Sequence, residues 1–257
     1  MSQGFSLYLA RDSGLHRLHP LTKLSLAGTL LVAAFALPGP WSSYAGFLLV
    51  LLPLAAWGKI LPGFLRSVAR SVLPFALSLF LIQGLLWPGG SPVAQLGPLS
   101  LKAEGLAFAL ASTGRILMIV SSFLLLALST RPDLLMIALV QRGFPSTLSY
   151  IVVTTIQIVP YFQGKARAIL DAQRSRGLET EGGLRRRLRA LLPLVVPLVL
   201  SSILDIEERA IALEARAFGR RGTKTSLQVL SDSRAQSVLR WAILALAPLL
   251  LVAGLVL

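Results

Sequence analysis

Long apolar runs separated by short polar turns dominate this chain. A membrane-spanning helix needs about 20 consecutive, mostly apolar residues. Runs that approach or reach this length lie at 24–37, 41–57, 72–87, 105–129 and 238–257. Proline and glycine end the first run at 38–40 and the third at 88–90. The pattern predicts an all-α membrane protein with about five transmembrane helices.

The long interval between the fourth and fifth runs predicts how the chain is divided. Residues 1–129 hold four transmembrane helices, and residues 235–257 form a C-terminal transmembrane helix. Residues 130–234 are more polar and rich in arginine. We interpret this interval as a cytoplasmic segment of helices inserted before the last span.

Two apolar stretches inside this segment, 150–162 and 190–204, test the number of spans. Both are shorter than a span, and they contain Pro160, Pro193 and Pro197, which interrupt helices. If both crossed the membrane, the strongly basic interval between them would be exported. We therefore interpret them as separate helices in or under the cytoplasmic interface.

Basic residues indicate the orientation of the chain. With the N-terminus in the cytoplasm, almost every Lys and Arg falls on the cytoplasmic side, as the positive-inside rule expects. Lys102 is the exception, in a loop on the outer side. The pattern predicts a multi-pass protein of the bacterial or archaeal inner membrane with a cytoplasmic N-terminus.

A short helix is predicted at 60–72, on the cytoplasmic surface. Leu61, Phe64 and Val68 recur at helical spacing, whereas Arg66 and Arg70 fall on the opposite face. This amphipathic pattern is typical of a helix that lies in the membrane interface.

Composition agrees with the membrane assignment. Of 257 residues, 54% are hydrophobic and 14% are charged, with a mean hydropathy of +0.73. A soluble protein carries about 25% charged residues. The net charge of +14 does not indicate nucleic-acid binding, because no stacking aromatic residues alternate with the basic ones.

Two arginine sites in the segment 130–234 are the strongest candidates for function. Residues 173–177 read Gln-Arg-Ser-Arg-Gly, and residues 214–219 read Glu-Ala-Arg-Ala-Phe-Gly. Arg176 follows Ser175 in the predicted last turn of one helix, and Gly177 is placed as its C-terminal cap.

The second site repeats this arrangement. Arg216 lies between Ala215 and Ala217 at the end of a predicted helix, 205–218, in which Asp205 can pair with Arg209. Ala217 is a poor residue for a helix C-cap, so we expect Gly219 to end this helix.

The spacing of the two sites has two explanations. Arginine near a helix C-terminus complements the helix dipole or binds lipid phosphates, and spacing alone favours this structural role. Alternatively, Arg176 and Arg216 dock into acidic grooves of a partner, since a guanidinium can engage a carboxylate through two hydrogen bonds. The small residues Ser175, Ala215 and Ala217 would then allow a close approach.

Other candidate chemistry is sparse. The chain has no cysteine and two histidines, His16 and His19, which argues against thiolate or histidine-rich metal sites. It shows no catalytic constellation, phosphate-binding loop or zinc-ligand helix, so we expect no enzymatic activity and no cofactor bound by this chain. Arg115 interrupts the fourth apolar run. We expect it to face the protein interior beside Ser112 and Thr113 and to pair there, which we favour over the alternative of a role in transport chemistry.

The chain resembles the transmembrane coupling (T) components of energy-coupling factor (ECF) transporters, the CbiQ/EcfT family. The resemblance covers most of the chain. Residues 19–24, His-Pro-Leu-Thr-Lys-Leu, are similar to the family's Asp-Pro-x-Thr-Lys-Leu opening. Further similarity lies at 129–139, 171–177 and 214–219. The family's Ala-Arg-Gly motifs read Ser-Arg-Gly and Ala-Arg-Ala here.

The resemblance implies a function for the arginine sites. In the family two such motifs end two crossed coupling helices, and their arginines insert into two ABC-type ATPase subunits. Carried over, Arg176 and Arg216 are the docking arginines, flanked by Ser175, Gly177, Ala215, Ala217 and Gly219. ATP and Mg²⁺ would be bound by the ATPases, as a homodimer or heterodimer, and a vitamin or a cobalt or nickel ion by a separate small membrane S component.

Two other functions remain open from the sequence. A conventional ABC importer permease forms its own translocation path and carries one cytoplasmic coupling loop, which 214–219 faintly resembles. A membrane-bound enzyme acting on lipids would need a catalytic set that the sequence does not show.

Overall fold

Two units make up the computed structural model of this chain. It describes residues 8–9, 11–37, 39–88, 91–96, 99–178, 183–220, 228 and 230–256. One unit, here the bundle unit, comprises Ser6–Ser149 and Leu230–Leu257. The other, here the helix-pair unit, comprises Met1–Phe5 and Tyr150–Val229.

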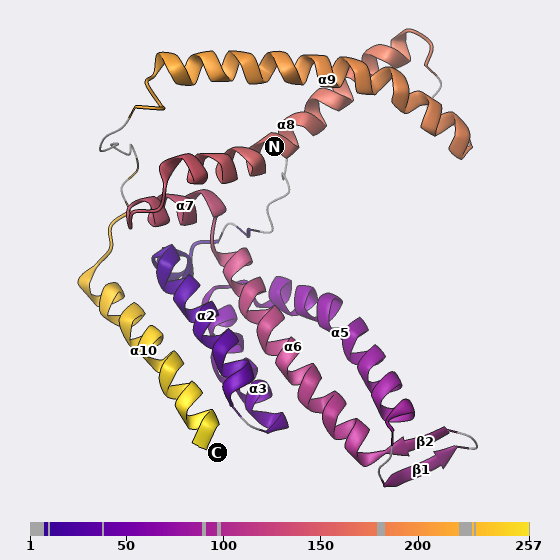
Figure 1. The fold of residues 1–257 in the computed structure, drawn as a ribbon, viewed down its shortest axis with the longest axis vertical. Helices are drawn as coiled ribbons and strands as arrows, with labels where there is room; N and C mark the ends of the chain where they lie inside the picture. The colour runs from indigo at the N-terminus through magenta and orange to yellow at the C-terminus, as the bar shows by residue number, and fades with distance from the viewer. Residues whose placement is uncertain are drawn as a thin grey trace. The chain divides into compact units, whose positions relative to one another are not determined.

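The bundle unit is built mainly of helices (Figure 1). A two-stranded antiparallel hairpin joins its two longest helices. In chain order its elements are α1 (Gly14–Arg17), α2 (Pro20–Ala36), α3 (Pro40–Gly46), the π-helical segment η1 (Phe47–Leu51), α4 (Leu52–Trp57), α5 (Leu61–Leu86), β1 (Pro92–Leu96), β2 (Leu99–Lys102), α6 (Ala103–Ser129), α7 (Pro132–Val140) and α10 (Arg234–Val256).

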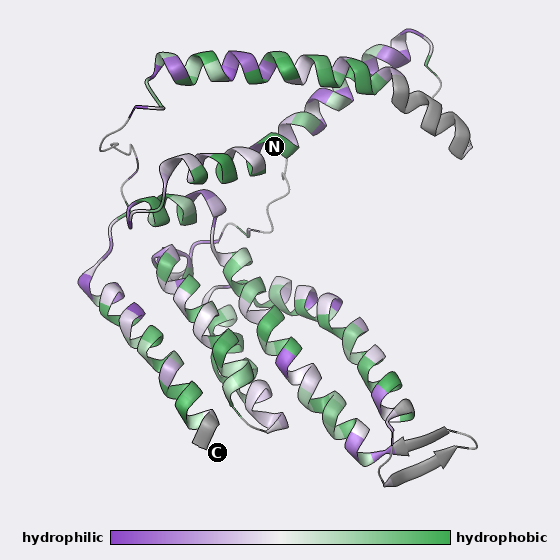
Figure 2. Ribbon diagram, in the orientation of Figure 1, coloured by the Kyte–Doolittle hydropathy of each residue, from purple (hydrophilic) through white to green (hydrophobic). Residues whose placement is uncertain are grey.

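Five of the helical stretches match the predicted spans. Four are long and apolar enough to cross a membrane: Pro40–Trp57, Leu61–Leu85, Ala103–Ser129 and Arg234–Gly254. The shorter apolar helix Pro20–Ala36 is the fifth. Figure 2 shows these helices predominantly in the hydrophobic colour. The predicted class, an all-α membrane protein with about five spans, is confirmed.

Proline sets the start of several of these helices. Pro20, Pro40, Pro62 and Pro132 stand at the first or second position of α2, α3, α5 and α7. The missing N–H of proline is no loss there, because the first N–H groups of a helix have no intrahelical acceptor. The turns that separate the apolar runs therefore also position the helices.

The separate surface helix predicted at 60–72 is wrong. These residues form the first half of α5, which continues to Leu86. Pro74 lies inside α5, and the helix bends in Figure 1. A proline removes one hydrogen bond and kinks a helix, which packing can tolerate. The predicted face is correct, since Phe64 and Val68 are buried and Arg66 is exposed.

The core of the bundle unit lies between α2, α5 and α6. Buried side chains from these helices form one cluster that includes Leu30, Phe64 and Met118. Gly105 allows α5 and α6 to approach closely, since a Cβ atom there would lie 2.0 Å from the carbonyl oxygen of Gln83. Close backbone contacts at small residues are typical of helices packed in membranes.

The helix-pair unit holds α8 (Ser146–Ser175) from Tyr150 onward and all of α9 (Leu184–Ala215), both long helices. The two separate interfacial helices expected at 150–162 and 190–204 are parts of these longer helices. Pro160 lies inside α8, and Pro193 and Pro197 lie inside α9. Among the described residues, neither helix meets the length and hydropathy of a span, and Figure 2 shows polar and apolar residues alternating along both.

Candidate functional site

The helices α8 and α9 cross and run antiparallel in the helix-pair unit (Figure 1). The rings of Tyr150 and Phe218 lie 4.9 Å apart, centre to centre. Further along, the Lys165 ammonium donates to the Ser201 carbonyl oxygen at 3.2 Å. The start of α8 therefore lies beside the end of α9.

A polar cluster fixes this crossing. Asp205 Oδ2 accepts hydrogen bonds from Lys165 at 2.5 Å and from the Tyr161 hydroxyl at 3.1 Å. The Lys165 hydrogen bond is the main reason why the pKa of Asp205 is lowered, and the same contact raises the pKa of Lys165. The predicted partner of Asp205, Arg209, is wrong: the carboxylate pairs across the helices rather than along α9.

Arg176 directly follows α8, which ends at Ser175. The Leu178 N–H donates to the Gln173 carbonyl at 3.0 Å, and the Gly177 N–H donates to the Arg174 carbonyl at 2.9 Å. Gly177 has a φ of +90°. These features define a Schellman motif, in which the residue after the cap is left-handed. Arg176 is the cap residue, and its side chain is exposed.

Arg216 occupies the same position at the end of α9. The Phe218 N–H donates to the Leu213 carbonyl at 3.0 Å, and the Ala217 N–H donates to the Glu214 carbonyl at 2.8 Å. Ala217 has a φ of +54°. The hydrogen bonds match those of the first site one for one, and Arg216 is exposed.

The expectation that Gly219 ends this helix is wrong. Ala217 itself takes the left-handed conformation, and α9 ends at Ala215. A left-handed L-residue is less stable than glycine by about 1–2 kcal/mol. The two backbone hydrogen bonds of the motif offset this strain, so the arginine site keeps its geometry without a glycine.

We predict opposite effects of substituting the left-handed residue of each motif, Gly177 and Ala217. Gly177→Ala should destabilise the end of α8 by about 1 kcal/mol, because only conformational strain opposes the new Cβ atom, which would meet nothing within 4 Å. Ala217→Gly should stabilise the end of α9 by about 0.5–1 kcal/mol. Hydrogen exchange of the amides in the last turn measures both. Equal protection in wild type and variants would contradict the assignment.

The two exposed arginines stand far apart. Phe218, two residues after Arg216, contacts Tyr150 near the start of α8, whereas Arg176 follows the end of that helix. Arg176 lies 26 positions after Tyr150, which corresponds to roughly 40 Å along an α-helix. The helix pair therefore presents one arginine near each end, too far apart for a single small groove.

A third arginine, Arg142, has the same cap geometry, at the end of α7. The Phe144 N–H donates to the Leu139 carbonyl at 3.1 Å, and Gly143 has a φ of +94°. Sequence reasoning missed this site, although the Arg-Gly pair after an apolar helix is a signal that could have found it.

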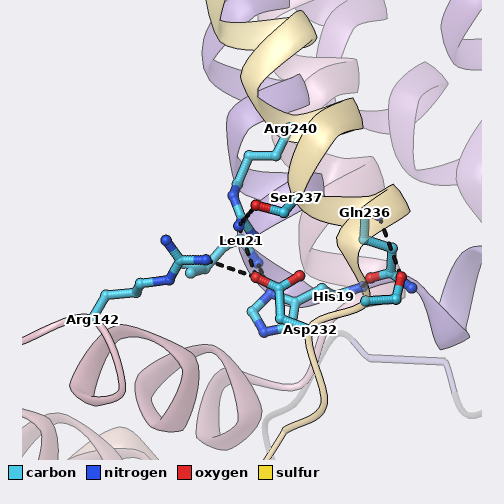
Figure 3. Close-up of polar contacts among 8 residues, drawn as sticks. His19, Leu21, Arg142, Asp232, Gln236, Ser237 and Arg240 are labelled. Carbon is cyan, nitrogen blue, oxygen red and sulfur yellow. Dashed lines mark hydrogen bonds and ion pairs between the residues drawn. The ribbon is translucent and has the colours of Figure 1, made fainter.

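Arg142 is already paired, whereas Arg176 and Arg216 form no ion pair with another described residue. Asp232 Oδ2 accepts from Arg142 Nη2 and from Arg240 Nη2, each at 2.7 Å (Figure 3). The hydrogen bond from Arg240 is the main reason why the pKa of Asp232 is lowered. This cluster ties α7 and the start of α10 together, so Arg142 serves the fold of the bundle unit.

The family-like opening at 19–24 has a structural role in the same region. His19 caps α2: its Nδ1 accepts from the Leu21 N–H at 3.3 Å, and its own N–H donates to Gln236 Oε1 at 2.8 Å (Figure 3). Burial lowers the pKa of His19, which favours the neutral ring that can accept. Lys23 Nζ donates to the Ser129 carbonyl at 2.7 Å, at the end of α6.

Arg115 does not lie where the sequence predicts. Thr113 is buried against the bundle, but Arg115 is on the exposed face of α6. No carboxylate among the described residues forms an ion pair with it. The expectation of a paired, inward-facing Arg115 is wrong.

Comparison with known proteins decides the family. The chain matches CbiQ, described as cobalt transport protein, over residues 11–227. This chain belongs to the CbiQ family. The family resemblance found in the sequence is thereby confirmed.

CbiQ-family relatives include several proteins named energy-coupling factor transporter transmembrane protein EcfT. The protein of Lacticaseibacillus paracasei is 29% identical over 253 residues, which cover 95% of this chain and 96% of the relative. That of Listeria innocua is 28% identical over 252 residues, 95% of each. That of Bacillus selenitireducens is 31% identical over 227 residues, 82% of each. Both arginine motifs lie within the range matched to CbiQ.

Proposed function

We propose that this chain is the T component of an ECF-type ABC importer. Its bundle unit anchors it in the inner membrane of a bacterium or archaeon, with the N-terminus and both arginine motifs in the cytoplasm. It links ATP hydrolysis by two ATPase subunits to uptake of a substrate that a separate S component binds. The names of the EcfT relatives support this proposal.

The observation that carries the proposal is the duplicated arginine cap. Arg176 and Arg216 occupy the same position in two Schellman motifs, and both are exposed. The equivalent Arg142 is paired to Asp232. Helix-dipole stabilisation would apply to all three arginines alike. It therefore does not explain why two of them are held on exposed caps at separate points of one helix pair.

Docking by these arginines is chemically reasonable. At an ordered helix cap the backbone is already fixed, so docking costs mainly the rotamer freedom of the arginine side chain, and its planar donors fit a carboxylate. The exposed small residues Ser175, Ala215 and Ala217 leave room for an acidic groove to approach each cap. ATP and Mg²⁺ would be held by the ATPases, and this chain would perform no catalysis.

The antiparallel helix pair suits the transmission of ATPase motion. Two contacts, Tyr150–Phe218 and Lys165–Asp205, hold α8 and α9 together at separate levels, so a displacement at one arginine would move the pair as a body. The middle of α9 also exposes apolar side chains, among them Val196, Leu200 and Leu204. Such a surface suits contact with a membrane subunit. In this proposal that subunit is the S component, which would bind a vitamin or a transition-metal ion.

Stoichiometry tests this function against the permease alternative. Native mass spectrometry of the complex released from membranes should find one copy of this chain with two ATPase subunits and one small membrane protein. A conventional permease would give two permease subunits per two ATPases. These would be either two copies of this chain or one copy with a similar permease subunit. Two copies of this chain in the intact complex would overturn the proposal.

A further inference from the structure

The arginine of α6 stands at the middle of a predicted span. Arg115 is preceded by 12 residues of this 27-residue helix and followed by 14. At a rise of about 1.5 Å per residue, it lies roughly 18 Å from one end and 21 Å from the other. The hydrocarbon core is about 30 Å thick, so either interface is about 15 Å from Arg115, beyond the reach of its side chain. The guanidinium therefore cannot reach water by extending along the helix.

Arg115 belongs to a stripe along the surface of α6. Residues 108, 112, 115, 119 and 123 follow each other at intervals of three and four, which places them on one helix face. Phe108 and Phe123 on this face are 43% and 51% exposed. Away from this stripe, the helix turns Met118, Ser121 and Leu125 into the bundle unit, where they are buried. The stripe thus combines two aromatic side chains with a charge between them.

No candidate span among the described residues carries an acidic residue near its middle, at the level of this arginine. The chain's 11 acidic residues include one in a candidate span, Glu104 in the first turn of α6. Glu104 is 11 residues from Arg115, about 16 Å along the helix. A second copy of the chain would therefore bring no mid-membrane acid to Arg115. Two copies packed side by side in the same orientation would place their two Arg115 side chains at the same depth, where the like charges would repel each other.

We propose that the stripe formed by Phe108, Ser112, Arg115, Ile119 and Phe123 binds a transmembrane helix of a different protein, and that an Asp or Glu of that helix at mid-bilayer pairs with Arg115. An ionised residue inside a membrane is rare and pairs with an opposite charge. The low dielectric of the bilayer strengthens such a pair. Phe108 and Phe123 flank it as apolar anchors.

This interface is independent of ATPase docking. The evidence for it is the position of Arg115 in α6 and the positions of the acidic residues in the sequence. The proposed function instead rests on Arg176 and Arg216 of the helix-pair unit. If the proposed function holds, a membrane subunit such as the S component is the natural source of the helix. If ATPase docking fails, the stripe still requires a mid-membrane carboxylate.

Site-specific photo-cross-linking tests the proposal in the native membrane complex. Benzoylphenylalanine replaces Phe108 or Phe123 in the full chain, with Phe35 of α2, which is 64% exposed, as the matched control. We expect positions 108 and 123 to label one membrane protein in a helix that carries a mid-bilayer Asp or Glu, and Phe35 not to label that helix. Arg115→Leu should lower the adduct yield at least about tenfold, with partial retention in Arg115→Lys.

Charge exchange completes the test. Arg115→Glu should abolish the adduct, and replacing the partner's carboxylate by arginine should restore it. Adducts with lipid only, adducts with a second copy of this chain only, a labelled helix without a carboxylate, or yields unchanged by Arg115→Leu would each overturn the proposal. The double variant Arg176→Glu with Arg216→Glu should leave these adducts in place, which separates this interface from ATPase docking.

Discussion

Reversing the charge of both cap arginines, Arg176→Glu with Arg216→Glu, is expected to abolish capture of the ATPases. Removing one partner of a buried interfacial charge pair costs about 2–5 kcal/mol, which corresponds to roughly 30-fold or more in affinity. A glutamate adds repulsion from the acidic groove. Co-purification from detergent, with the ATPase retained per chain as the measured quantity, gives the result.

The single variants and a control make this experiment specific. Each single reversal should weaken capture less than the double one, because the second site keeps the ATPase pair tethered. Arg220→Glu changes the same charge four residues after Arg216, at an exposed position outside the motif, and should retain capture. Membrane insertion should be equal in all variants. Undiminished capture by the double variant would remove the docking role from both arginines.

The second large effect is expected at Asp232, where Asp232→Ala should destabilise the bundle unit by about 2–4 kcal/mol. The carboxylate pairs with two guanidinium groups, and the Arg240 side chain is only 7% exposed. Arg240 Nη1 is already buried without a partner among the described residues. Removing one partner of a fully buried ion pair costs about 3–5 kcal/mol. The partial exposure of Asp232 lowers this figure.

Thermal unfolding in detergent measures the loss, with a fall of about 5–10 °C expected for a chain of this size. The matched control is Asp12→Ala, which removes the exposed 3.7 Å pair with Arg17 and should change stability by less than about 0.5 kcal/mol. Combining Asp232→Ala with Arg240→Met should recover part of the loss, since no buried charge is then unpaired. A loss in the double variant equal to the sum of the single losses would contradict the pairing.

The same pair gives stability a defined pH dependence. Because the pKa of Asp232 is lowered in the folded chain, its contribution is present above the unfolded-state pKa and is lost as pH falls through the folded-state pKa. Asp232→Ala should therefore show a smaller loss of stability between neutral and acidic pH than the wild type. An identical acid transition in both would contradict this contribution.

Local patterns predicted much of this protein correctly. The five spans follow from hydropathy alone, because lipid accepts only helices whose backbone is hydrogen-bonded internally. Gly177 predicted the end of α8 and hence the position of Arg176, because glycine adopts the left-handed conformation readily. Proline was a poorer guide: Pro74, Pro160, Pro193 and Pro197 all lie inside continuous helices. Each removes a single backbone hydrogen bond, which a long packed helix can tolerate.

The partners of charged residues could not be predicted in the same way. Helical spacing assigned Asp205 to Arg209, but the structure pairs it with Lys165, 40 residues earlier. Asp232 and Arg142 are 90 residues apart. Ala217 was rejected as a cap because its intrinsic preference opposes a positive φ, yet the hydrogen bonds of the motif hold it there. In each case a contact distant in the sequence, or a set of backbone hydrogen bonds, outweighed the local preference.

The sequence by itself determined the membrane class, the number of spans and the two arginines that end the helix pair, since each depends on residues close together in the chain. Only the tertiary structure decided that Arg176 and Arg216 share one cap geometry at separated points of an antiparallel pair, that Arg142 is held by Asp232, and that Arg115 faces outward from the bundle. The physical reason is that burial and ion pairing depend on which helices meet. Hydropathy places helices in the membrane but does not specify the faces they turn toward one another.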